Sequence, residues 1–433
     1  MSQPTLLLSP QFQGVPAQGG TLDVLVRLQA PDQPLEDIVY EPKRLALVVD
    51  RSGSMSGQPL REALRCAMHI ARHLPSRDLV SLVLYDDRVQ VFAPLAAPAA
   101  LVAMQSAVDL IDSGGSTDLF GGWEAGAIQL ESGSSQGISR VILLSDGQAN
   151  HGLTRIDDII SHVKTWAAKG VTTTTVGLGR GFNEELMIAM AQAGGGQQYY
   201  GQTAVDLYDS FDEELSLLEA MYLRNISVKF VPAAGVLVEP ISLVSQNPNG
   251  TYRLSDLAWG AETWMAVRLH ISPGQVETRN LFAAVATGAS LDGVELAVSS
   301  AVLQLPVLDQ ESFLVLPADE LVSRRLDEVA FARVSADLTE ALRRGDMKKA
   351  QELLEQMAAR FGKHPWLRAK LSVLKRLAEE DTEMMLKESS YSHMKLGKNL
   401  ASKHESLYMS DETNSAMPAF LRKKAEEGRG KGR

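Results

Sequence analysis

Short apolar runs alternate with amphipathic segments over the first half of the chain. The runs Leu45–Val49 and Val141–Leu144 are nearly free of polar residues, whereas Pro59–Leu74 carries apolar residues at helical spacing. A continuous apolar strand is typical of a strand that is covered on both faces. The alternation therefore predicts a Rossmann-like α/β fold, in which a mostly parallel sheet has helices on both faces.

One pair of strands departs from this order. The predicted strands Leu79–Leu84 and Val89–Phe92 are separated mainly by the polar turn Asp86–Arg88, which is too short for a crossover connection. We therefore predict an antiparallel hairpin at one edge of the sheet. Further helices are predicted at Ile156–Lys169 and Ala204–Met221, and the second of these closes the α/β region.

The periodicity changes after Met221. Alternating segments joined by Gly, Pro and Asn turns predict a β-sandwich-like region, with strands at Ile226–Val231, Thr263–Ile271, Leu281–Ala286 and Leu296–Leu303. The N-terminal segment Thr21–Gln29 alternates in the same way, and we expect it to return to that region as an extra strand.

The last third of the chain is helical up to a polar end. Apolar residues at helical spacing predict helices at Asp319–Arg343, Asp346–Phe361 and Pro365–Lys387, which could form a small bundle. From Ser389 onward the chain is rich in Ser, Lys and Gly, which predicts a flexible basic tail. A linear motif that folds onto a partner is the alternative for this tail.

The expected organisation has five parts. They are an N-terminal β segment (1–43), an α/β domain (44–221), a β-sandwich-like domain (222–309), a helical bundle (310–388) and a flexible basic tail (389–433).

Side chains that carry oxygen atoms are grouped in three segments, two at the ends of predicted strands and one in a loop. The first strand ends in VVDRSGSMSG, a later loop reads SGGSTDLF, and another strand ends in VILLSDG. In sheets of this kind ligands bind at the carboxyl ends of the strands, where these segments would meet. Hard cations such as Mg²⁺ or Mn²⁺ prefer such oxygen ligands. The predicted metal ligands are Asp50, Ser52, Ser54, Thr117 and Asp146.

The donor set suggests what the cation would do. Two carboxylates nearly neutralise a divalent ion, while the hydroxyls leave it electron-poor at any open position, so a partner's Asp or Glu could bind there. Three neighbours are candidate partner contacts: Arg51, Asp118 and His151. A solvent-exposed role for Arg51 and His151, and a loop-bracing role for Asp118, are the alternatives.

These motifs and their order resemble the von Willebrand factor A family, whose metal-ion-dependent adhesion site uses the same pattern. The resemblance covers about residues 44–221 and implies a Rossmann-like sheet with one antiparallel edge strand. It also implies that Ser52, Ser54 and Thr117 contact the metal, while Asp50 and Asp146 act directly or through water. The wider architecture resembles bacterial proteins related to Ca²⁺-activated chloride channel regulators and inter-alpha-trypsin inhibitor heavy chains.

Composition and charge indicate which classes of protein are less compatible with the sequence. The formal net charge of −11 argues against general nucleic-acid binding, which needs a clustered basic face. The chain has one cysteine, Cys66, and no basic N-terminal leader, which together favour a cytoplasmic location. No uninterrupted apolar run approaches the roughly 18–20 residues that a membrane span needs.

The sequence as a whole predicts a bacterial, non-enzymatic module that binds an acidic residue of a partner protein through Mg²⁺. One alternative is an adaptor or substrate-recruiting subunit of an ATPase or kinase/phosphatase system. A surface adhesin and a metal-dependent hydrolase are weaker alternatives. The adhesin would need a leader, and the hydrolase would need a general base, for which His151 is the candidate near the metal loops.

Overall fold

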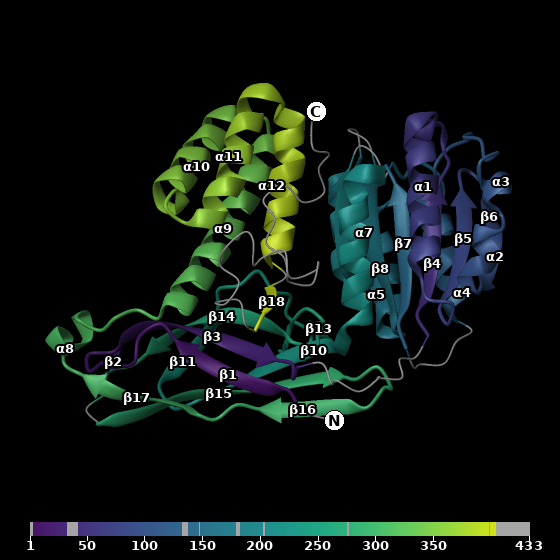
Figure 1. Cartoon of the computed structure of the whole chain (residues 1–433). Helices are drawn as coiled ribbons and strands as arrows, with labels where there is room; N and C mark the ends of the chain where they lie inside the picture. The colour runs from purple at the N-terminus through teal and green to yellow at the C-terminus, as the bar shows by residue number, and fades with distance from the viewer. Residues whose placement is uncertain are drawn as a thin grey trace.

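The computed structural model describes residues 3–32, 42–131, 137–146, 148–178, 182–201, 204–274, 277–397 and 399–403. Figure 1 shows an α/β body, a β-sandwich that lies across the base of the molecule, and a group of helices that rises from the sandwich beside the α/β body. Among the described helices, none is long and apolar enough to cross a membrane.

The α/β body is built on a six-stranded sheet with the order β6-β5-β4-β7-β8-β9. Its strands are β4 (Arg44–Asp50), β5 (Leu79–Tyr85), β6 (Val89–Ala96), β7 (Ser139–Ser145), β8 (Val171–Leu178) and β9 (Gly195–Gly201). Strand β6 pairs antiparallel with β5, and the other neighbours pair in parallel. The predicted Rossmann-like sheet with an antiparallel edge hairpin is therefore confirmed.

Helices cover both faces of this sheet. They include α1 (Gln58–His73), α4 (Leu119–Glu131), α5 (Ile156–Ala168), α6 (Glu184–Ala193) and α7 (Ala204–Glu219). In β4, Leu45 and Leu47 pack in the cluster that holds α1 and α7, whereas Ala46 and Val48 pack with α4, α5 and α6. Alternate side chains of a strand point to opposite faces, so β4 must be apolar throughout. Two short helices, α2 (Pro98–Val102) and α3 (Gln105–Val108), lie between β6 and α4 in the chain.

Helix α4 approaches the sheet closely through two buried glycines. A Cβ at Gly122 would collide with the ring of Tyr85, and one at Gly126 would collide with Val48. Both neighbours are fully buried and have no room to move aside. The glycine spacing of one helical turn therefore sets how near α4 lies to β4 and β5.

We expect Gly122→Ala to lower the free energy of unfolding. Overpacking against a rigid ring costs about 1–3 kcal/mol, which outweighs a gain of roughly 1 kcal/mol in helix propensity. Urea unfolding followed by circular dichroism measures the change. Ile128→Ala, on the exposed side of the same helix, is the control and should shift stability by about 0.5 kcal/mol or less. A Gly122→Ala protein as stable as the wild type would contradict this account of the packing.

The sandwich has two sheets. The first has the order β1-β3-β14-β11, with strands β1 (Thr5–Pro10), β3 (Gly20–Gln29), β14 (Ala261–Ile271) and β11 (Val236–Pro240). The second has the order β12-β10-β15-β17-β2, with strands β12 (Tyr252–Arg253), β10 (Met221–Pro232), β15 (Thr278–Ala289), β17 (Leu303–Leu308) and β2 (Val15–Pro16). The N-terminal strand β3 thus lies between β1 and β14. The predicted strand 296–303 is instead two strands, β16 (Glu295–Ser299) and β17, both paired with β15.

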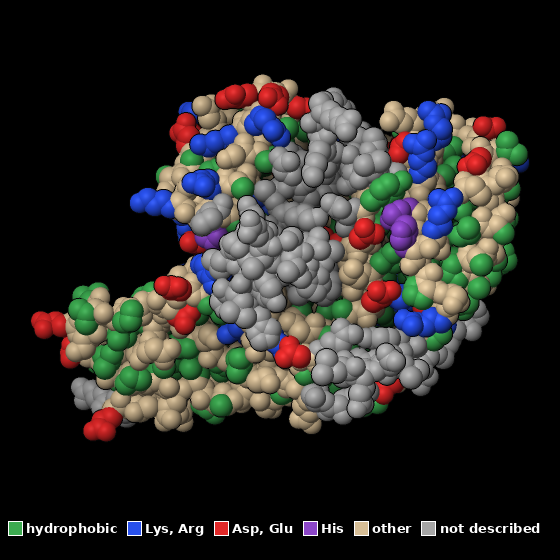
Figure 2. Space-filling model, in the orientation of Figure 1, with side chains coloured by type: hydrophobic (Ala, Val, Ile, Leu, Met, Phe, Trp, Pro, Cys, Tyr) green, Lys and Arg blue, Asp and Glu red, His purple; other side chains and the backbone are tan. Residues whose placement is uncertain are grey.

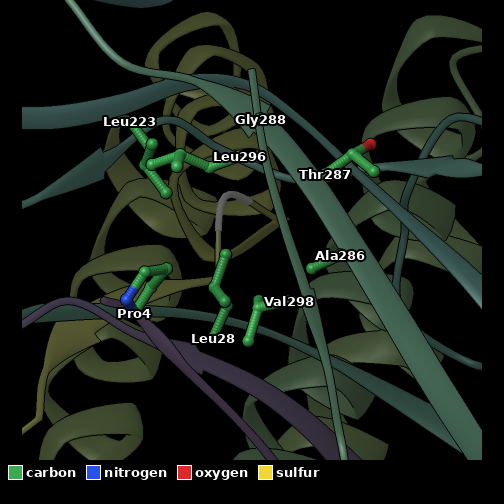
Figure 3. Close-up of a pocket in the computed structure, with 8 residues that line it drawn as sticks. All are labelled: Pro4, Leu28, Leu223, Ala286, Thr287, Gly288, Leu296 and Val298. Carbon is green, nitrogen blue, oxygen red and sulfur yellow. The ribbon is translucent and has the colours of Figure 1, made fainter. Parts of the chain in front are cut away.

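A small cavity lies within the sandwich (Figure 3). It is lined by Pro4, Leu28, Leu223, Ala286, Thr287, Gly288, Leu296 and Val298. Apart from the Thr287 hydroxyl, these side chains offer no polar group that could orient a ligand, and we interpret the cavity as a packing gap.

The helical part consists of α9 (Glu320–Arg343), α10 (Met347–Phe361), α11 (Pro365–Glu380) and α12 (Thr382–Gly397), preceded by the short helix α8 (Gln310–Leu314). Helix α9 packs on the first sheet of the sandwich, where Val322 and Val329 join Leu25 and Trp264 in one apolar cluster. The predicted helix 365–387 is divided at Asp381, whose carboxylate accepts the Met384 N–H at 3.0 Å and so begins α12.

The expectation of a flexible tail from Ser389 is wrong for residues 389–403. Helix α12 continues to Gly397, with Tyr391 buried against Tyr200 at a ring distance of 5.4 Å. Strand β18 (Leu400–Ser402) then pairs with the start of β14. These partners are distant in sequence, so the polar composition of the segment gave no sign of them. The rest of the predicted tail, 404–433, lies outside the described residues.

We expect a protein that ends at residue 388 to unfold at a clearly lower temperature than the full chain, because it loses the buried Tyr391 and strand β18. Removal of one buried aromatic side chain costs about 3–5 kcal/mol in typical cores. A protein that ends at residue 403 keeps every contact described here and is the control. Equal melting temperatures for both truncated proteins, measured by differential scanning fluorimetry, would show that the docked segment contributes nothing to stability.

Candidate functional site

The three predicted metal loops meet at the carboxyl end of the central sheet. Asp50 ends β4, and Asp146 directly follows the neighbouring strand β7. The loop after β4 bonds to the loop before α4, since Gly53 N–H donates to the Gly115 carbonyl at 3.2 Å and Gly114 N–H donates to the Arg51 carbonyl at 2.9 Å. Parallel strands present their carboxyl ends at one edge, which is why residues almost 100 positions apart come together.

The third loop bonds to the second through Thr117. The Thr117 N–H donates to Oδ1 of Asn150 at 2.7 Å, and the Thr117 carbonyl accepts the N–H groups of Asn150 and His151 at 3.2 and 3.1 Å. Thr117 is almost fully buried. The third loop therefore fixes the backbone of Thr117 through both its N–H and its carbonyl.

Asp50 is a fully buried carboxylate at the base of the site. Its Oδ1 accepts the Ser52 N–H at 2.8 Å, and its Oδ2 accepts the Ser145 hydroxyl at 2.7 Å. Burial raises the pKa of Asp50, and the nearby charge of Asp146 raises it further, although the hydrogen bonds from Ser145 and Ser52 act in the opposite direction. The charge of Asp146 thus disfavours the ionised form of the buried Asp50.

Asp146 is held through both its side chain and its backbone. Its Oδ1 accepts the Gln148 N–H at 3.1 Å, and its carbonyl accepts the Asn183 N–H at 2.7 Å. Asn183 in turn caps α6, because its Oδ1 accepts the Leu186 N–H at 3.2 Å. The start of α6 is therefore tied to the candidate metal residue.

The hydroxyls extend the site from the interior to the surface. Ser52 is buried, Ser54 is exposed, and their Oγ atoms lie 3.1 Å apart. Within the described residues, no three His, Cys, Asp or Glu side chains converge on a common point. A cation here would have to combine two carboxylates with hydroxyl and water oxygens, a donor set that suits a hard ion such as Mg²⁺.

The three candidate partner residues differ in their surroundings. Arg51 is half-buried, and its Nε lies 3.1 Å from Oδ2 of Asp86, so the side chain is anchored by an ion pair. Asp118 accepts the Gly121 N–H at 3.0 Å and lies against Gly152, which fits a residue that braces the loop. His151 is exposed.

The sequence pattern did not indicate that Ser145, Asn183 and Asp86 belong to the site. Ser145 stands next to Asp146 in the SDG motif, and its position at the end of a strand could have indicated it. Asp86 was assigned only to a turn, yet its Oδ1 accepts the Arg88 N–H and its carbonyl accepts the Asp118 N–H, both at 2.8 Å. Contacts of Asp86 and Asn183 cross between separate loops, and no spacing in the sequence signals them.

The helical part of the chain touches the same region. Phe182, which precedes Asn183, is buried, stacks on Tyr200 at 5.8 Å and lies under Nζ of Lys387 at 5.1 Å. The Tyr200 hydroxyl donates to the buried Glu388 at 2.8 Å. Helix α12 therefore packs against Phe182, whose neighbour Asn183 donates to the carbonyl of the candidate metal residue Asp146. On the face shown in Figure 2, basic side chains are mixed with acidic ones and form no single large basic patch.

Comparisons with known proteins indicate the family of the α/β body. Residues 45–213 match the family model of the von Willebrand factor type A domain. A protein of Synechocystis sp., described as uncharacterized, is 26% identical over 293 residues, which are 63% of this chain and 67% of that protein. Inter-alpha-trypsin inhibitor heavy chain H1 of Mesocricetus auratus is 29% identical over 169 residues, which are 36% of this chain but only 18% of that protein.

The fold likeness extends beyond the matched domain. The solved structure of a von Willebrand factor type A protein from Catenulispora acidiphila superposes with a TM-score of 0.65 at 15% identity and covers 89% of each chain. At this identity the likeness shows a shared fold alone. Domains of the matched family generally mediate protein–protein interaction and commonly bind a divalent metal. Residues 45–213 of this chain therefore form a von Willebrand factor type A domain.

Proposed function

We propose that this chain is an interaction module that binds a partner protein through a divalent cation. The cation would be Mg²⁺, or Mn²⁺, held by Asp50, Ser52, Ser54, Thr117 and Asp146. A carboxylate of the partner would complete its coordination. The observation that carries this proposal is the fully buried Asp50 carboxylate beside Asp146, at a point where two neighbouring loops supply hydroxyls.

The electrostatics favour a cation at this point. An ionised carboxylate without solvent is costly unless an opposite charge or hydrogen bonds compensate it. Asp50 has two hydrogen bonds, yet burial and Asp146 still raise its pKa. A divalent cation held at this site would offset this effect and favour the ionised form of Asp50.

The position of the donors favours capture of an external ligand. Asp50, Ser52 and Thr117 are buried, whereas Ser54 is exposed. A cation held by this set would therefore be within reach of a ligand from the solvent side, where Ser54 lies. The bound cation would supply charge there, and an acidic side chain is the natural ligand for a hard ion.

We also propose that the protein is cytoplasmic. The sequence has a single cysteine, Cys66, and so cannot form an internal disulfide, which suits a reducing compartment such as the cytoplasm.

We expect Mg²⁺ to raise the melting temperature of the wild type and to have no effect on Asp50→Asn. A ligand that binds only the folded state adds about 2.7 kcal/mol of stability at a concentration of 100 times its Kd. Asn preserves the shape of Asp50 but removes the charge that holds the cation. Asp337→Asn, on an exposed part of α9, removes the same charge elsewhere and should keep the full Mg²⁺ response. An undiminished response in Asp50→Asn would refute the site assignment.

A pull-down from native cell lysate tests partner binding. The wild type in Mg²⁺ should retain a protein that is lost with EDTA and with Asp50→Asn, but is kept by Asp337→Asn, because only the first variant disturbs the cation. Recovery of an ATPase, kinase or phosphatase would make the chain an adaptor for that system. Identical recoveries under all conditions would exclude the metal site as the working surface. Phosphoesterase or peptidase turnover that is lost in Asp50→Asn would favour a hydrolase instead.

A further inference from the structure

We propose that Arg51 selects partners that carry two neighbouring carboxylates, one for the cation and one for the Arg51 guanidinium. This inference rests on the proposed function, because it concerns the ligand of the same site. It adds the chemical class of the partner, a segment with two acidic side chains close together.

The backbone holds Arg51 in a fixed place beside the site. Arg51 stands between Asp50 and Ser52 in the sequence. Its N–H donates to the Tyr85 carbonyl at 2.8 Å, and its carbonyl accepts the Gly114 N–H at 2.9 Å. Its Cα is therefore fixed from both sides, by the end of β5 and by the loop that carries Thr117.

The side chain is anchored as well. Nε of Arg51 lies 3.1 Å from Oδ2 of Asp86, and Asp86 is itself buried. The other oxygen of Asp86 accepts the Arg88 N–H, and its carbonyl accepts the Asp118 N–H. Asp86 thus ties the loop after β5 to the loops that carry Arg51 and Asp118, and it holds the guanidinium by one edge.

The outer edge of the guanidinium remains available. The Arg51 side chain keeps 23% of its surface exposed. Among the described residues its ion-pair partner is Asp86, and its two terminal nitrogens donate no hydrogen bond. Those nitrogens form the planar fork that binds both oxygens of a carboxylate. An arginine that is already anchored loses little conformational freedom when it binds a ligand, so its contacts contribute more fully to affinity.

Two anion-binding groups at neighbouring positions distinguish ligands by the number of acids they carry. A single carboxylate can satisfy the cation or Arg51, whereas two acids a few residues apart can satisfy both within one chain. The second contact becomes intramolecular once the first has formed, which raises the overall affinity. Lysine would supply the charge but not the fork.

The test measures binding of synthetic peptides to the full chain by isothermal titration calorimetry. The peptides are capped at both ends, equal in length and alanine-based. One carries a single Glu, and the others carry two Glu that are adjacent or separated by one or two residues. In Mg²⁺ we expect at least one two-Glu peptide to bind the wild type about tenfold more tightly than the single-Glu peptide, a difference of about 1.4 kcal/mol. EDTA should abolish binding of all of them.

The variants decide whether Arg51 is responsible. Arg51→Gln should remove the preference for two acids, and Arg51→Lys should retain only part of it. Arg88→Gln, which removes an exposed positive charge nearby, should keep the full preference. The Mg²⁺-induced rise in melting temperature shows that each variant is folded and binds metal.

The outcomes separate this inference from the proposed function. Mg²⁺-dependent binding without a preference for two acids, or with the same preference in Arg51→Gln, overturns the role of Arg51 and leaves the metal site standing. Absence of Mg²⁺-dependent binding for every peptide overturns the capture of acidic side chains, and this inference with it.

Discussion

The candidate site depends on the complete burial of one carboxylate, Asp50, at the carboxyl end of the central strand. A buried charge must be compensated, and here the Ser52 N–H and the Ser145 hydroxyl each donate to one of its oxygens. Those two donors come from the loop after β4 and from the end of β7. The need to satisfy Asp50 therefore fixes these two segments relative to each other and brings Asp146 beside them.

Rigidity around this point comes mainly from backbone hydrogen bonds between loops. Gly53 and Gly114 bond across to neighbouring segments, and Thr117 is held by the loop that follows Asp146. Asp86 lies in the loop after β5, where its carboxylate accepts the Arg88 N–H and also anchors the Arg51 side chain. Donors arranged in this way need little reorganisation when a ligand binds, which favours affinity. The framework beneath is equally constrained, since Gly122 and Gly126 let α4 lie directly on the sheet.

The described parts of the sandwich and of the helical region pack against the von Willebrand factor type A domain. Helix α12 places Tyr391 and Glu388 against Tyr200 at the edge of the sheet, and Lys387 against Phe182. Strand β18 then joins the same sheet of the sandwich as β3, with β14 between the two strands. These contacts stabilise the relative positions of the three bodies in Figure 1.

The pattern of apolar and polar residues was enough to predict the parallel sheet, its antiparallel edge hairpin and the grouping of Asp50, Thr117 and Asp146. Hydrophobic periodicity and the ends of strands can be read from short segments of the chain. The split at Asp381 and the docking of α12 and β18 were decided by tertiary structure, because a polar segment such as 389–403 becomes ordered only when distant partners bury it. The same holds for Ser145, Asn183 and Asp86, whose roles arise from hydrogen bonds between loops. Sequence specifies which groups are available to bond, but only the folded chain brings donors and acceptors from separate loops within 3 Å of each other.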